Sequence, residues 1–236
     1  MSIKWIFKDN IILTENIVKY CTKKVKIAGF DLDHTLIKPK GKRIHPKDEN
    51  DFEYVFPNIK KKLLTLHNQG FNILIFSNQE NLDLKPGKKK IVLKRIERLV
   101  DEIFDKNNIP LQVLISNKLD YCRKPNTGLF DYFLNLHNIK PHKSSFYVGD
   151  AAGRTKTDSK KADFACSDRM FALNCNINFM TPEQCFDIDD KREFICEKSA
   201  NIIFMKEDIN GSLDKSYINW DEINKFNIIM LMGPPG

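Results

Sequence analysis

Four short, largely apolar runs, separated by longer amphipathic segments, constrain the fold of this chain more than any other feature. They cover residues 25–28, 71–76, 111–115 and 145–148. Their length and apolar character indicate buried strands. The segment after Pro57 has apolar residues at helical spacing and ends at Gly70, which is the usual punctuation of a helix. Because a strand, helix, strand order implies right-handed crossovers, the pattern predicts an α/β fold whose parallel sheet is flanked by helices.

The composition is that of an ordinary globular protein, and 236 residues suffice for one domain with a sizeable core. Thirty-eight Lys and Arg against 31 Asp and Glu leave a formal charge of +7, which favours an anionic partner without naming one. The six cysteines are dispersed and no secretory leader is evident, so we expect a soluble intracellular protein, in the nucleus or the cytoplasm. No apolar run approaches the ~20 residues needed to cross a bilayer, which argues against a membrane protein.

The first apolar run leads into a segment with two carboxylates, Asp31 and Asp33, followed by Thr35. Side chains alternate along an extended backbone, so both aspartates should project the same way, which is costly unless a cation lies between them. Hard oxygen ligands suit Mg²⁺, and such a pair could leave one carboxylate to attack phosphorus and the other to move a proton. The alternative is a solvated acidic pair before a threonine turn, with no chemistry.

The second apolar run ends in two polar side chains, Ser77 and Asn78. Ligands of a parallel sheet collect beyond the carboxyl ends of its strands, so these side chains should lie beside Asp31 and donate hydrogen bonds to phosphoryl oxygens. A serine that caps the next loop is an equally good account of Ser77.

Two later stretches add charged candidates. Arg123 and Lys124 precede a proline and a predicted helix over residues 129–136, and a cation held at a helix start suggests that a bound anion offsets the unfavourable dipole; we expect Lys124 to take that role. The fourth apolar run delivers Asp150, and a small-residue turn with Arg154 follows it. These groups together have one consistent use: a metal between carboxylates, with a hydroxyl and an ammonium on phosphoryl oxygens.

Basic residues flank the predicted site in two polar segments, residues 38–43 and 81–90, which we interpret as exposed loops. A helix predicted over residues 91–108 carries further cations, among them Lys94 and Arg95. These cations could follow a phosphate backbone, although a solvated surface is the simpler account. The intervals between the site residues contain little beyond a loop, a helix and a strand, so we expect a small or absent cap and an open site that suits a polymer end.

The motifs, in order, are FDLDHTLI at 30–37, IFSNQ at 75–79, RKP at 123–125, FYVGDAAGR at 146–154 and DFACSDRMFALN at 163–174. They resemble the haloacid dehalogenase superfamily of phosphotransferases and, within it, the phosphatase half of the polynucleotide kinase/3'-phosphatase family. The last two motifs are specific to that family, and the resemblance extends from about residue 26 to residue 186. It implies a Rossmann-like sheet of the haloacid dehalogenase type.

This resemblance implies an enzyme that removes a terminal 3'-phosphate from DNA or RNA ends, in DNA end repair, through an aspartyl-phosphate. Asp31 would attack phosphorus, and Asp33 would protonate the leaving sugar hydroxyl and then activate water. Mg²⁺ would be held by Asp31, Asp150 and the backbone carbonyl of Asp33. The other implied roles are phosphoryl binding by Ser77 and Lys124, substrate binding by Asn78, and loop ordering by Thr35. Arg123 and Arg154 would contact the nucleic acid or support the site, and Asp158 and Asp163 would have a structural or second-sphere role.

Two interpretations compete with this one: a small-molecule or phosphoprotein phosphatase of the same superfamily, and a catalytically silent module that binds DNA ends. His34 stands where many relatives carry glycine, and we expect the loop to tolerate it rather than to use it for substrate contact. The last residues resemble a strand entering a phosphate-binding loop but stop before its lysine, so we expect no kinase activity. The predicted divisions are an N-terminal strand or hairpin extension (1–24), a phosphatase domain (25–190), a linker (191–225) and the start of a truncated P-loop kinase domain (226–236).

Overall fold

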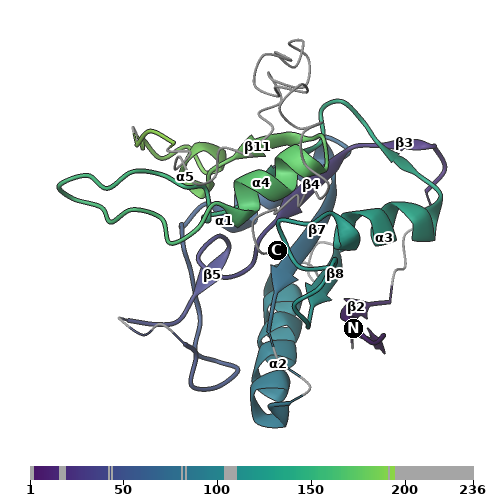
Figure 1. Ribbon diagram of the computed structural model, residues 1–236, viewed down its shortest axis with the longest axis horizontal. Coiled ribbons are helices and arrows are strands. Elements are labelled where there is room, and N and C mark those ends of the chain that lie inside the picture. Colours follow the sequence, from purple (N-terminus) through teal and green to yellow (C-terminus); the bar gives the residue numbers. More distant parts are fainter. Residues whose placement is uncertain are drawn as a thin grey trace, which may run out of the picture.

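The computed structural model describes residues 3–15, 20–41, 43, 45–80, 82, 84–103, 111–190 and 192–194. Its centre is a seven-stranded sheet with helices packed around it (Figure 1). From one edge to the other, the strand order is β1-β2-β8-β7-β4-β10-β11. Their bounds are β1 Trp5–Phe7, β2 Ile11–Thr14, β4 Ile27–Phe30, β7 Asn72–Asn78, β8 Leu111–Ser116, β10 Phe146–Val148 and β11 Asn178–Met180.

The sheet is mostly parallel, as the strand, helix, strand pattern predicts. Strands β8, β7, β4, β10 and β11 pair in parallel. Strands β1 and β2 form an antiparallel hairpin that adds to β8, with Leu13 opposite Leu114. The predicted N-terminal hairpin is therefore part of the main sheet, and it is tied to the body of the protein where Trp5 Nε1 donates to Glu97 at 2.7 Å.

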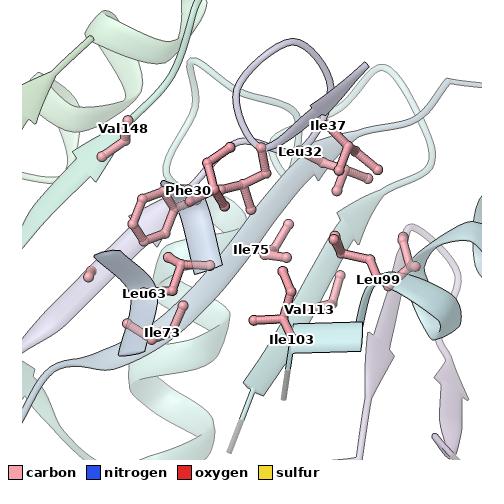
Figure 2. Close-up of a cluster of buried hydrophobic side chains, with 14 of the residues drawn as sticks. Phe30, Leu32, Ile37, Leu63, Ile73, Ile75, Leu99, Ile103, Val113 and Val148 are labelled. Carbon is pink, nitrogen blue, oxygen red and sulfur yellow. The ribbon is translucent and has the colours of Figure 1, made fainter. Parts of the chain in front are cut away.

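Two helices cover one face of the sheet. The helices of the chain are α1 (Ile59–Asn68), α2 (Pro86–Ile103), α3 (Gly128–His137), α4 (Ser167–Asn174) and α5 (Pro182–Cys185). Leu63 of α1 and Leu99 of α2 lie in one buried cluster with Ile75 and Val113 of the sheet (Figure 2). Apolar residues three and four positions apart on each helix form this contact, so burial of the helical stripes holds the layer together.

Two other helices cover the opposite face. Phe130 of α3 and Phe171 of α4 pack with Leu74 and Tyr147 of the sheet in a second buried cluster. Neighbouring residues of a strand point to opposite faces, so Leu74 and Ile75 of β7 belong to different clusters. This two-sided burial explains why the central strands are continuous apolar runs, and it confirms the α/β architecture.

The largest boundary difference concerns α2. The sequence predicts a loop over residues 81–90 and a helix over 91–108, whereas α2 begins at Pro86 and so contains Lys88 and Lys90. Proline needs no backbone donor at the first turn of a helix, and lysine is a good helix former, so a polar stretch continues the helix. Residues 104–110 lie outside the described residues.

A two-stranded flap is the insertion between the acidic motif and α1. Strands β5 (Ile37–Lys38) and β6 (Glu53–Tyr54) pair antiparallel, and the chain between them projects from the body of the molecule (Figure 1). The buried carboxylate of Asp51 accepts hydrogen bonds from the backbone N–H groups of Lys40 and Lys47 and from Arg43 Nη1. The flap fits the prediction of a small cap.

The folded unit continues slightly beyond residue 190. Arg192 Nη2 lies 2.7 Å from Asp190 Oδ2, and Arg192 Nη1 lies 3.2 Å from Asp163 Oδ1. The predicted linker, apart from residues 192–194, and the predicted P-loop segment lie outside the described residues. Among the residues described, none of the helices combines the length and apolar character needed to cross a bilayer.

Candidate active site

The carboxyl ends of two neighbouring parallel strands bring two aspartates together. Asp31 follows β4, and its backbone N–H donates to the carbonyl of Val148 in β10 at 2.8 Å. Asp150 follows β10, and Asp168 enters from the first turn of α4. One carboxylate oxygen from each of the three aspartates lies within 4.8 Å of the other two. The predicted meeting of Asp31 and Asp150 at one sheet edge is thus observed, with a third carboxylate that the sequence analysis did not include.

A glycine allows α4 to approach closely enough to deliver Asp168. A Cβ atom placed on Gly149 would lie 2.4 Å from Asp168 Cβ and 2.5 Å from Asp168 Oδ2. Asp168 Oδ2 also accepts a hydrogen bond from the backbone N–H of Ala151 at 3.0 Å. Any larger residue at position 149 would therefore push Asp168 out of the cluster.

Lys124 supplies a buried ammonium to this cluster. Its Nζ donates to Asp31 Oδ1, Asp168 Oδ1 and the Tyr147 hydroxyl, each at 2.7 Å. All three donors of the ammonium are therefore used. The backbone of Lys124 is fixed as well, because Asn78 Nδ2 donates to its carbonyl and Asn78 Oδ1 accepts from its N–H, both at 3.0 Å. Asn78 thus positions Lys124, which explains its presence at the end of β7.

The electrostatics of the cluster favour uptake of positive charge. Burial raises the pKa of Asp31 well above its usual range; Lys124 opposes this effect, while Asp168 and Asp150 add to it. Burial and the neighbouring Asp168 raise the pKa of Asp150 to about 7. Burial would lower the pKa of Lys124, but Asp168 and Asp31 outweigh it and raise that pKa.

The donor set fits a divalent cation. Three carboxylates share one ammonium, so the fully ionised cluster has an excess of two negative charges, and its free ligand atoms are hard oxygens of the kind that Mg²⁺ prefers. The aspartate cluster can therefore hold a metal ion.

Mg²⁺ should stabilise the protein more at pH 8 than at pH 6. Without metal, the pKa of Asp150 rises from 3.8 to about 7, so the folded state binds more protons than the unfolded state between these values, and this group's contribution to stability falls as pH rises. Protons and Mg²⁺ compete for the same carboxylate oxygens. The Mg²⁺-induced rise in Tm should therefore grow between pH 6 and pH 8, as Asp150 loses its proton. Thermal unfolding with and without millimolar Mg²⁺ measures it. Asp150→Asn should flatten the pH dependence, and an equal rise at both pH values would contradict the assignment.

Asp33 does not share the cluster with Asp31. Its Oδ1 accepts from Arg95 Nη2 and its Oδ2 from Gln79 Nε2, both at 2.6 Å. The prediction that both aspartates project the same way assumes an extended backbone, but β4 ends at Phe30 and the chain then turns. A metal contact through the backbone carbonyl of Asp33 stays a prediction.

Thr35 ties the turn after Asp33 to the cluster. Its hydroxyl accepts from the backbone N–H of Asp150 at 3.1 Å and lies 3.3 Å from Asp150 Oδ1. His34 is exposed, with φ of 63° in the left-handed region that suits glycine. Ser77 is buried, and its Oγ accepts from Gln79 Nε2 at 3.0 Å. The same Nε2 donates to Asp33, so Gln79 links Ser77 to Asp33.

The two predicted arginines occupy different surroundings. Arg154 is buried in an ionic cluster, with Nε 2.7 Å from Asp163 Oδ2, a short contact from Nη1 to Glu183, and Asp190 nearby. This geometry makes Arg154 a tie between the loop after Asp150 and the chain around residue 190. Arg123 is partly exposed and lies 3.8 Å from a carboxylate oxygen of Glu80, and substrate contact by Arg123 stays a prediction.

Sequence reasoning did not assign a role in the site to four residues: Gln79, Tyr147, Asp168 and, in its observed place, Arg95. Gln79 and Asp168 lie inside motifs of the resemblance, which was the available signal. Tyr147 reads as an ordinary strand residue, and burial raises its pKa well above 10, with Asp168 adding to the effect, so its hydroxyl stays a donor. Arg95 was expected on the solvent side of α2 and is buried beneath Asp33 instead.

Comparison with known proteins agrees with this geometry. The model of the polynucleotide kinase 3 phosphatase family matches residues 26–186, which is more than half of the chain. The chain belongs to this family. The fold class and resemblance inferred from the motifs are thereby confirmed.

Several curated relatives of the family align well with this member. An uncharacterised 20.8 kDa protein of Autographa californica nuclear polyhedrosis virus is 35% identical over 167 residues, 71% of this chain and 88% of the relative. The bifunctional polynucleotide phosphatase/kinase of Schizosaccharomyces pombe is 35% identical over 79% of this chain and 43% of its own length. A polynucleotide 3'-phosphatase of Arabidopsis thaliana is 34% identical over 68% of this chain. The chain spans only 24% of that plant protein.

A solved structure shows the same fold. A HAD-like phosphatase from Mesorhizobium loti superposes with a TM-score of 0.54 at 14% identity, over 73% of this chain and 78% of that one. This family member therefore has the haloacid dehalogenase type of sheet, with flanking helices and a small flap.

Proposed function

We propose that this protein is a Mg²⁺-dependent polynucleotide 3'-phosphatase that removes the terminal 3'-phosphate from DNA or RNA ends, in DNA end repair. The observation that carries the proposal is the buried cluster in which Lys124, Asp150 and Asp168 surround the Asp31 carboxylate. Family membership and the Arabidopsis thaliana relative named polynucleotide 3'-phosphatase support the substrate class.

In the proposed reaction, Asp31 attacks phosphorus, the bond from phosphorus to the sugar oxygen breaks, and Asp33 gives its proton to that oxygen. Water then attacks the aspartyl-phosphate while Asp33 takes a proton from it, which releases inorganic phosphate and restores the Asp31 carboxylate. Lys124 would stay beside the attacking oxygen, held by Tyr147 and Asp168. Mg²⁺ held by Asp31, Asp150 and the backbone carbonyl of Asp33 would offset the negative charge of the phosphoryl oxygens.

Exposed cations beside the site support a polymeric substrate. Helix α2 starts shortly after β7 ends, so Lys85 and Lys88, both exposed, lie at the same edge of the sheet as Ser77. Lys40 and Arg43 are exposed on the flap. Such clusters attract a phosphate backbone, and the small flap leaves room for a strand end.

The test compares three substrates with purified protein: an oligonucleotide with a 3'-phosphate, the same oligonucleotide with a 5'-phosphate, and a nucleoside monophosphate. We expect phosphate release from the 3'-phosphorylated oligonucleotide to be much faster than from the other two substrates, and to require Mg²⁺, so that EDTA abolishes it. Equal or faster turnover of the monophosphate would identify a small-molecule phosphatase instead. Tight binding of the ends without hydrolysis would identify a silent end-binding module.

A further inference from the structure

Arg95 is a buried arginine, and contact with a phosphate backbone would not explain why it is buried. It is 1% exposed, and it lies on the face of α2 that also carries Val92, Ile96 and Leu99. These neighbours belong to the apolar cluster between α2 and the sheet. Placing a guanidinium there is costly, because the charge loses its hydration.

The hydrogen bonds of Arg95 offset only a small part of this desolvation cost. Its Nη2 lies 2.6 Å from Asp33 Oδ1, a charge-assisted hydrogen bond. Within the described part of the chain, the buried Nε and Nη1 groups of Arg95 have no hydrogen-bond partner. An apolar side chain of similar length would suit this position better if packing alone decided it. The contact with Asp33 is therefore what the buried arginine provides.

Asp33 is held from two sides. Gln79 Nε2 donates to Asp33 Oδ2 at 2.6 Å and also lies 3.0 Å from Ser77 Oγ. The backbone N–H of Gln79 donates to the carbonyl of Ser116, which fixes Gln79 to β8. The Asp33 side chain is still one third exposed, so it can reach a bound substrate. The two hydrogen bonds thus fix the orientation of the Asp33 carboxyl group before any substrate binds.

We propose that Arg95 is a positioning residue that holds the Asp33 carboxyl group in the orientation needed for proton transfer. The inference rests on the proposed role of Asp33, which protonates the leaving sugar oxygen and later takes a proton from water. Arg95 suits this task because its guanidinium group is planar and rigid and because α2 packs into the core from Val92 to Ile103. Proton transfer depends steeply on such alignment.

The test uses leaving groups that differ in their need for a proton. Arg95→Met and wild type are compared on the first turnover of p-nitrophenyl phosphate, a 3'-phosphorylated oligonucleotide and glycerol 2-phosphate, all with Mg²⁺. Nitrophenolate leaves without a proton, whereas the sugar and glycerol oxygens need one. We expect Arg95→Met to slow the first turnover of both alkyl esters by about 10²-fold and to leave the nitrophenol burst nearly unchanged.

The burst separates this role from a structural one. The amplitude of the burst measures the number of intact active sites. After the burst, Arg95→Met should hydrolyse the aspartyl-phosphate slowly, because Asp33 is also needed to activate water. Arg95→Met combined with Asp33→Asn should lose no more alkyl-ester activity than Asp33→Asn alone. Lys61→Met, which removes an exposed charge from α1, should behave as wild type. If Arg95→Met does not fold, Arg95→Lys should show the same split with a smaller loss, since it keeps the charge but not the fork.

Equal slowing of all three esters, no slowing of any, or additive losses in the double variant would overturn the role of Arg95. The proposed function fails separately if wild type hydrolyses glycerol 2-phosphate and p-nitrophenyl phosphate but not the oligonucleotide. In that case the comparison between glycerol 2-phosphate and the aryl ester still tests Arg95. Failure of wild type to hydrolyse any of the three would overturn both.

Discussion

Asp31→Asn should abolish phosphate release from a 3'-phosphorylated oligonucleotide, with kcat falling by at least ~10³-fold. The amide keeps the shape of the side chain but cannot form an aspartyl-phosphate. Burial raises the pKa of Asp31, with Asp168 and Asp150 adding to it against Lys124, so removing this charge relieves repulsion. We therefore expect the variant to be at least as stable as wild type. Phosphate release and thermal unfolding, measured side by side, separate lost chemistry from lost fold.

The matched control for this substitution is Asp187→Asn. Asp187 is exposed and pairs with Lys62 at 3.2 Å at the surface. Its φ of 61° lies in the left-handed region, which asparagine adopts readily. The control should retain wild-type turnover. Wild-type turnover by Asp31→Asn would remove Asp31 as the nucleophile.

Lys124→Met should lower both stability and activity. Without the ammonium, the buried carboxylates of Asp31 and Asp168 face each other unpaired, which typically costs about 3–5 kcal/mol of the free energy of unfolding. Loss of a cation beside the phosphoryl group should reduce kcat by ~10²–10³-fold. Urea unfolding in EDTA measures the first effect, and phosphate release with Mg²⁺ measures the second.

A second variant shows whether unpaired charge causes the loss of stability. Adding Asp168→Asn to Lys124→Met removes one of the two facing carboxylates, so the double variant should be more stable than Lys124→Met alone while staying inactive. Lys61→Met, an exposed change of the same type, should not alter stability. If Lys124→Met in EDTA unfolds at the same urea concentration as wild type, the buried ion pairs do not hold the site together.

Much of the fold could be predicted from local pattern. The apolar run at residues 71–76 predicted β7, because a strand buried on both faces is a continuous apolar run. The segment after Pro57 predicted α1, because its proline and glycine mark the two ends of the helix. The start of α2 at Pro86 was missed, since a lysine-rich stretch suits both a loop and an exposed helical turn. The antiparallel attachment of β2 to β8 joins residues about a hundred positions apart, which no local pattern encodes.

Part of the site followed from the rule that parallel strands end at one edge. That rule placed Asp31 next to Asp150 and brought Ser77 to the end of the neighbouring strand. It could not find Asp168, which depends on how closely α4 approaches Gly149. The sequence pattern also placed Arg95 on the surface, because one arginine among several lysines gives no sign of a buried partner.

The amino-acid sequence by itself determined the order of strands and helices, the family and the strand ends at which chemistry is expected, because periodicity and motif spacing are properties of the chain. Only the tertiary structure decided which charges meet: Asp168 with Lys124, and Arg95 with Asp33. The physical reason is that a buried charge is stable only beside a partner, and these partners come from segments 44 and 62 residues apart, joined by packing of the layers.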